Sequence, residues 1–100
     1  MSADESTVWD ALRMVIDPEI GENIVDLGLV YRVDCSPGLV DVDVTMTSPA
    51  CPAAESIADE AREAIRDACP GAAEVRVNVV FEPPWTPERV SDAVRQRFGL

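Results

Sequence analysis

An amphipathic helix between two alternating strands is the feature that most limits how this chain can fold. In residues 39–47, valines alternate with aspartates and threonines, a pattern typical of a strand with one buried face. Residues 52–69 repeat alanine and isoleucine at helical spacing, and residues 75–81 alternate again. A strand, a helix and a strand in succession form a right-handed βαβ unit, so the two strands should run parallel.

The flanking segments complete an α+β domain. Residues 7–16 predict a first helix that Ser6 or Thr7 can cap, and Pro18 should end it. Residues 17–23 predict a loop, and a strand from about residue 28 to 34 should pair with strand 39–47 across the turn at 36–38. A last helix should start at Thr86. The order α-β-β-α-β-α predicts one two-layer domain over residues 1–100, with a mixed three-stranded sheet.

The charged residues exclude several kinds of partner and reaction. The chain has 8 basic and 19 acidic residues, a net charge of −11, and neither histidine nor lysine. Nucleic acids and anionic membranes need a basic patch, so we expect no nucleic-acid partner and no membrane partner. Without these two residue types, the chain cannot build Ser-His-Asp, Cys-His or Schiff-base chemistry. The first residues do not resemble a signal peptide, and we expect a cytoplasmic protein.

A cysteine lies where the strand of residues 39–47 gives way to the helix. Cys51 precedes Pro52, which suits the first position of a helix. Backbone N–H groups and the helix dipole favour a thiolate there. The hydroxyls of Thr45, Thr47 and Ser48 lie just before it. This combination predicts a small functional site centred on Cys51; the alternative is that Cys51 is a small buried apolar residue.

The two other cysteines are expected to be packing residues. Cys35 and Cys69 lie 16 and 18 residues from Cys51. The chain therefore has no C-x-x-C pair, which argues against a structural zinc site or a thioredoxin-type centre. The sequence leaves open whether Cys35 and Cys69 form a disulfide.

Four ordered motifs carry a family resemblance. They are DPEI at residues 17–20, IVDLGLVY at 24–31, MTSPACP at 46–52 and EPPWT at 82–86. Together they resemble the metal–sulfur cluster biosynthetic family, which includes SufT-like and PaaD-like proteins. The resemblance implies the fold of iron–sulfur cluster assembly domains and a role in maturing or delivering iron–sulfur clusters. The sequence ends without the cysteine-bearing tail of PaaD-like members, so a SufT-like member is expected.

The resemblance also implies which residues form the site. Cys51 matches the functional thiol of the family, and Asp17, Glu19, Asp26 and Thr47 match polar positions near it. Carboxylates around a thiolate suit the binding of a cation better than nucleophilic attack. Because a cluster needs about four ligands, mostly thiolates, we expect iron or an iron–sulfur cluster to be held transiently. Cys51 would be the metal ligand, shared with a second chain or a client's thiols, and no organic cofactor is expected.

The function predicted from these residues is that of an accessory factor rather than an enzyme. Its expected partners are the iron–sulfur assembly machinery and client apo-proteins, and a homodimer is left open. Glu82 and Trp85 are expected either to contact clients or to form a rigid loop with an aromatic plug. Two alternative functions are a small thiol-dependent enzyme and a non-metal adaptor that binds clients through its sheet edge and the loop at 82–86.

Overall fold

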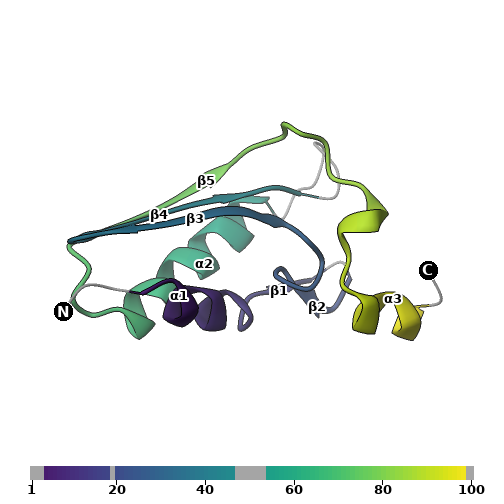
Figure 1. The fold of residues 1–100 in the computed structure, drawn as a ribbon, viewed down its shortest axis with the longest axis horizontal. Coiled ribbons are helices and arrows are strands. Elements are labelled where there is room, and N and C mark those ends of the chain that lie inside the picture. The colour runs from purple at the N-terminus through teal and green to yellow at the C-terminus, as the bar shows by residue number, and fades with distance from the viewer. Residues whose placement is uncertain (1–3, 19, 47–53, 99–100) are drawn as a thin grey trace.

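The protein places one sheet over two helices, with a third helix at one end (Figure 1). The computed structural model describes residues 4–18, 20–46 and 54–98. Its elements in chain order are α1 (Glu5–Leu12), β1 (Ile16–Asp17), β2 (Glu22–Asn23), β3 (Val30–Ser36), β4 (Leu39–Val44), α2 (Ala54–Ala68), β5 (Glu74–Val79), the 3-10 turn η1 (Pro87–Arg89) and α3 (Asp92–Phe98).

Strand β4 lies at the centre of the main sheet. It pairs antiparallel with β3, where Val42 lies opposite Val33, and parallel with β5, where Val42 lies opposite Val77. Helix α2 makes the connection between the two parallel strands. The mixed three-stranded sheet and the α+β class predicted from the sequence are therefore confirmed.

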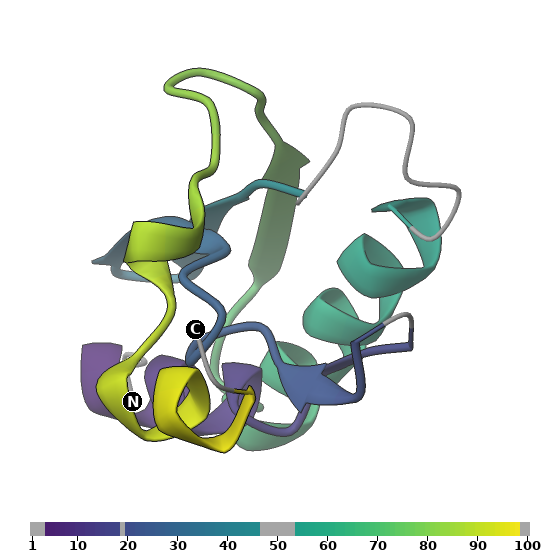
Figure 2. The ribbon, with the colours of Figure 1, turned by 90° about the vertical axis from the view of Figure 1, so that its right-hand side faces the viewer.

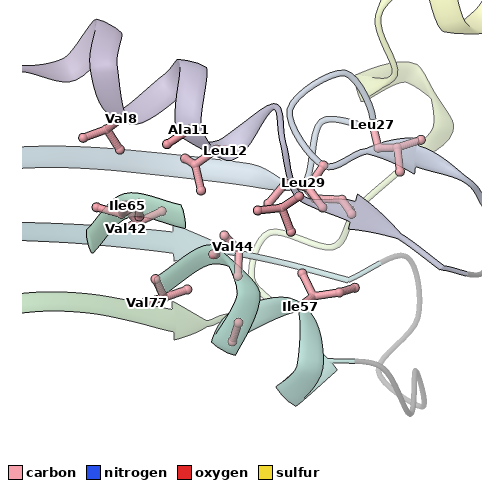
Figure 3. Packing of buried hydrophobic residues seen from close by; sticks show 14 of the residues in the cluster. Val8, Ala11, Leu12, Leu27, Leu29, Val42, Val44, Ile57, Ile65 and Val77 are labelled. Atoms are coloured by element: carbon pink, nitrogen blue, oxygen red, sulfur yellow. The ribbon is translucent and has the colours of Figure 1, made fainter. Parts of the chain in front are cut away.

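The hydrophobic core lies between the sheet and the helices α1 and α2 (Figure 3). Alternate residues of β4 supply Val40, Val42 and Val44, all fully buried, because successive side chains of a strand point to opposite faces. Helix α2 meets them with Ile57 and Ile65. Its alanines carry no bulky side chains, which allows the helix to lie close to the sheet. Among the helices that the structure describes, none combines the length and hydrophobicity needed to cross a membrane.

The opposite face of the sheet carries a polar network. The guanidinium of Arg32 donates to Asp43 at 3.0 Å and to Asp41 at 3.0 Å, and the Asn78 amide donates to both aspartates. These hydrogen bonds, first of all those from Arg32, hold the pKa of both carboxyl groups below its usual range. Most of this network is exposed, so it contributes less to stability than the hydrophobic face does.

The first helix is shorter than the apolar pattern predicts. Asp4, rather than Ser6 or Thr7, caps it by accepting a hydrogen bond from the Thr7 N–H at 2.8 Å. The helix ends at Leu12, but Val15 is still buried and continues the apolar stripe from an irregular turn. The spacing of apolar residues shows which side chains are buried. It overestimates the length of the helix, because the turn after Leu12 also buries Val15.

The other departures from the prediction lie at the ends of elements. The segment predicted as a loop contains the short antiparallel hairpin β1–β2. The predicted last helix begins as the 3-10 turn η1, and α3 follows only from Asp92. The Ser91 hydroxyl accepts a hydrogen bond from the Val94 N–H at 3.4 Å, so a second capping residue restarts the chain as an α-helix.

Candidate functional site

Backbone hydrogen bonds join four segments at the end of the sheet where β4 stops. The Ile24 N–H donates to the Val15 carbonyl at 3.0 Å, and the Leu29 N–H donates to the Ile24 carbonyl at 3.0 Å. The Thr45 N–H then donates to the Leu29 carbonyl at 2.7 Å. Figure 2 views the molecule from this end, where the β1–β2 hairpin lies near the start of α2. These bonds fix the motif at 24–31 between Val15, which precedes the motif at 17–20, and the end of β4.

Two carboxylates are buried in the β1–β2 hairpin. Asp17 is 1% exposed and Glu22 is 9% exposed, and the two residues lie opposite each other in the hairpin register. Burying a carboxylate is costly unless polar groups compensate it, and neither residue is without an interaction partner. Gly21 closes the turn with φ of 81°, donating its N–H to the Asp17 carbonyl at 2.7 Å. Asp17 is thus a buried strand residue, where the sequence predicted a loop.

Asn23 connects the hairpin to Asp26. Its side-chain amide donates to Glu22 at 3.3 Å and to Asp26 at 2.9 Å, and its carbonyl oxygen accepts the Asp26 N–H at 2.9 Å. Glu22 and Asn23 are not among the site residues that the motifs predict. The Asn-x-x-Asp spacing was the available signal, because asparagine side chains commonly bond to backbone a few residues further on.

The segment around Gly28 packs against the turn at residues 89–91. The Ser91 N–H donates to the Asp26 carbonyl at 2.7 Å. Gly28 has φ of 73°, and a Cβ atom there would lie 2.3 Å from the Arg89 carbonyl oxygen. Only glycine allows both this conformation and this close approach. The motif at 24–31 therefore positions the chain that follows the Pro-Pro-Trp loop.

Aromatic side chains fasten the Pro-Pro-Trp loop itself. The indole N–H of Trp85 donates to the Leu27 carbonyl at 2.7 Å, and the Tyr31 hydroxyl donates to the Pro83 carbonyl at 2.8 Å. The Arg89 guanidinium lies 4.6 Å from the centre of the Tyr31 ring, within cation–π range. Trp85 is half-buried against the core, whereas Glu82 is exposed. Tyr31, which the sequence analysis did not select, stands beside the irregularity where β3 begins.

One hydroxyl at this end has no hydrogen-bond partner among the residues that the structure describes. Thr45 is 1% exposed, and its Oγ1 is buried and unpaired. A buried polar atom without a partner lowers stability by about 1–3 kcal/mol, so such groups are rare unless they serve a function. Thr45 is one of the three hydroxyls that precede Cys51 in the sequence.

Half of the predicted site lies outside the described residues. These residues are Glu19, Thr47, Ser48 and Cys51, and their proximity to Asp17 and Asp26 remains a prediction. Within residues 4–18, 20–46 and 54–98, no three cysteine, aspartate or glutamate side chains are grouped closely enough to hold a metal ion. The described acids therefore do not form a metal site by themselves.

The other two cysteines lie towards the opposite end of the sheet. Cys35 is half-buried on β3 and Cys69 is buried just after α2, and both are free thiols. Burial, more than neighbouring acidic groups, raises the pKa of both thiols above its ordinary value. A thiol of this kind is poorly nucleophilic and a poor metal ligand near neutral pH.

The fold and the motifs define a known class of domain. A solved structure of a domain of unknown function, DUF59, from Bacillus anthracis superposes with a TM-score of 0.91 at 38% identity. The match covers 96% of this chain and 92% of that one. The sequence model of the family described as "Iron-sulfur cluster assembly protein" matches residues 5–79. The chain belongs to this family, which confirms the resemblance carried by the four motifs.

Two relatives match nearly end to end. The Fe-S protein maturation auxiliary factor YitW of Bacillus subtilis is 39% identical over 97 residues, which cover 96% of this chain and 94% of that protein. The Fe-S protein maturation auxiliary factor SufT of Staphylococcus aureus is 40% identical over 88 residues, covering 87% of this chain and 99% of that protein.

Proposed function

We propose that this protein is an accessory factor in iron–sulfur cluster assembly or delivery, and that Cys51 is its transient ligand for iron or sulfur. The accessory role is supported by the family and by the names of the two relatives. Those names describe auxiliary factors rather than enzymes, which agrees with a role that involves no turnover chemistry.

The observation that carries the role of Cys51 is the polar end of the sheet. Asp17 and Glu22 are buried there, and Asn23 ties Glu22 to Asp26. Cys51 comes seven residues after Val44 ends β4 and three before Ala54 begins α2. The chain thus carries its proposed functional thiol between two elements that meet this end of the molecule.

A single thiolate among carboxylates suits a cargo that must leave again. Four thiolates hold a cluster firmly, whereas one thiolate supplemented by oxygen ligands leaves coordination positions for the thiols of a client. The net charge of −11 attracts a metal cation over a long range. Cys51 would bind the iron or sulfur directly, while Asp17, Glu19 and Asp26 supply the charge around it.

The proposed partners follow from this exchange. Iron or a cluster would come from the assembly machinery and pass to the cysteines of a client apo-protein. We place this activity in the cytoplasm. A second copy of the chain could supply a further thiol, which would make a dimer the loaded form.

Cells that lack the gene provide the test of this function. They are complemented with the wild type, with Cys51→Ser, or with Cys35→Ser, a cysteine of β3, as the matched control. We expect Cys51→Ser to lose most of the activity and cluster content of client iron–sulfur enzymes, and Cys35→Ser to retain them. Circular dichroism confirms that each variant is folded. A folded Cys51→Ser protein that restores client enzymes fully would contradict the proposal.

A further inference from the structure

Strand β5 forms one edge of the main sheet and presents backbone groups to solvent. The Glu74 and Val80 N–H groups point towards β4, bonding to the Gly38 and Val44 carbonyls at 2.9 and 2.8 Å. Because this direction alternates along a strand, the N–H and C=O groups of Val75, Val77 and Val79 point the other way. In the part of the chain that the structure describes, no strand pairs with that outer edge.

An arginine from α2 partly occupies this edge. The Arg62 guanidinium donates to the Val77 carbonyl at 3.3 Å and forms an ion pair with Asp59. A charged side chain across an exposed edge discourages sheet-to-sheet aggregation. The contact is a single hydrogen bond from a long, flexible side chain, so an incoming strand can displace it at little cost.

A groove runs beside the same edge, between β5 and α2, which Figure 2 shows next to each other. Its volume is about 390 Å³, and most of its lining is apolar, with Ala54, Ala58, Val77, Val79 and Phe81 as the apolar members. Phe81 is 42% exposed. The open backbone edge and the apolar floor therefore lie side by side, which is the arrangement that recognises an extended peptide.

The charge around the groove selects the kind of peptide. Two charged side chains line the groove, Arg62 and Glu55. The charge of Arg62 is paired with Asp59, whereas Glu55 is exposed and has no ion-pair or hydrogen-bond partner among the described residues. The chain as a whole carries a charge of −11. A second copy would bring the same negative charge to the edge, whereas a segment that carries lysine or arginine would gain from it.

We propose that the β5 edge and this groove bind an extended basic segment of a partner protein as a fourth strand. Its backbone pairs with the outward groups of Val75, Val77 and Val79, and its alternate aliphatic side chains fill the groove. A lysine or arginine of the segment faces Glu55. This binding requires no metal and no thiol, so it is measurable whether or not Cys51 carries cargo.

The probe is a capped heptapeptide in which valine alternates with threonine and both ends carry lysine. Titrated into the ¹⁵N-labelled protein and followed by NMR, it should shift the amide signals of β5 and the first turns of α2. The same peptide N-methylated at alternate residues should not bind, because it cannot complete the strand pairing. Shifts confined to the polar face at Asp41 and Asp43, or no saturable binding at millimolar peptide, would overturn the proposal.

Two charge reversals on the same helix give the matched test. Glu55→Lys and Glu60→Lys change the net charge equally, and both residues are exposed, but only Glu55 lines the groove. We expect Glu55→Lys to weaken binding of the lysine peptide at least fivefold and Glu60→Lys to weaken it less than twofold. Equal losses in the two variants would mean that the peptide responds only to overall charge, and would refute the proposed site.

Discussion

The two ends of the sheet surround their reactive groups in different ways. At the end near the β3–β4 turn, burial and, to a smaller extent, nearby acidic groups raise the pKa of the Cys35 and Cys69 thiols. At the other end, Asp17 and Glu22 are buried carboxylates, and the Thr45 hydroxyl is buried without a hydrogen-bond partner in residues 4–18, 20–46 and 54–98. The first arrangement lowers the thiolate fraction of both cysteines near neutral pH. The second arrangement buries polar groups, although a core selected only for stability would exclude them. These groups lie where the chain leaves β4 towards Cys51.

The largest expected effect comes from Gly28, which holds the polar end together. An alanine there combines a left-handed conformation with a Cβ 2.3 Å from the Arg89 carbonyl oxygen, and should lower the free energy of unfolding by about 3 kcal/mol. Gly21→Ala is the control, since its φ is 81° but nothing lies within 4 Å of the added atom. It should lower this free energy by about 1 kcal/mol. Urea denaturation measures both, and equal losses would show that the close approach does not matter.

The hydrogen bonds that hold the Pro-Pro-Trp loop should have the next largest effect on stability. Trp85→Phe keeps the aromatic bulk but leaves the Leu27 carbonyl without its donor, which should lower the free energy of unfolding by about 2 kcal/mol. Tyr31→Phe removes a more exposed hydrogen bond to Pro83 and should lower it by less than about 1 kcal/mol. Urea denaturation of both variants gives the order, and a larger loss for Tyr31→Phe would place the main anchor of the loop at Tyr31.

Thiol reactivity compares the two ends directly. Because the pKa of Cys35 and Cys69 is raised, their thiolate fraction at pH 7.5 is below that of an unperturbed cysteine, and it should grow as the pH rises through 9. We expect iodoacetamide to label Cys51 faster than either of them, since a thiol just before a helix favours the thiolate, and we expect ferrous iron to protect Cys51 from labelling. Peptide mass spectrometry over time gives the three rates. Labelling of Cys35 before Cys51 would contradict the expected difference in thiol reactivity between the two ends of the sheet.

The smallest expected change is an increase in stability rather than a loss. Thr45→Val replaces an unpaired buried hydroxyl with a methyl group of similar size, so it should raise the free energy of unfolding by about 1 kcal/mol. Val42→Thr, at a fully buried position of the same strand, should lower it instead. Thermal and urea unfolding decide the sign. A destabilised Thr45→Val protein would mean that the hydroxyl already makes a stabilising contact.

The parts of the fold that follow a simple side-chain period could be predicted from the sequence. The alternation of Val40, Val42 and Val44 and the helical spacing of Ile57 and Ile65 report burial directly. Two-residue strands such as β1 and β2 are too short to show a side-chain period, so the sequence predicts a loop where the hairpin lies. The end of α1 was misplaced because Val15 is buried outside a helix.

The candidate site was predictable in its residue types more than in its geometry. The motifs selected Asp17 and Asp26, but nothing in the sequence shows that Asp17 is almost fully buried. Asn23 escaped selection because its role depends on bringing Glu22 and Asp26 together, a tertiary arrangement. Trp85 was selected as a loop residue, and its bond to Leu27 crosses 58 positions of the chain, beyond the range of any local pattern.

Anaerobic reconstitution with ferrous iron and sulfide tests the central claim most directly. Wild type, Cys51→Ala and Cys35→Ala are each loaded, desalted and examined by optical and Mössbauer spectroscopy together with iron analysis. We expect the wild type and Cys35→Ala to retain sulfur-ligated iron and Cys51→Ala to lose it while remaining folded. Equal iron content and identical spectra in Cys51→Ala and wild type would contradict the assignment of Cys51 as the ligand.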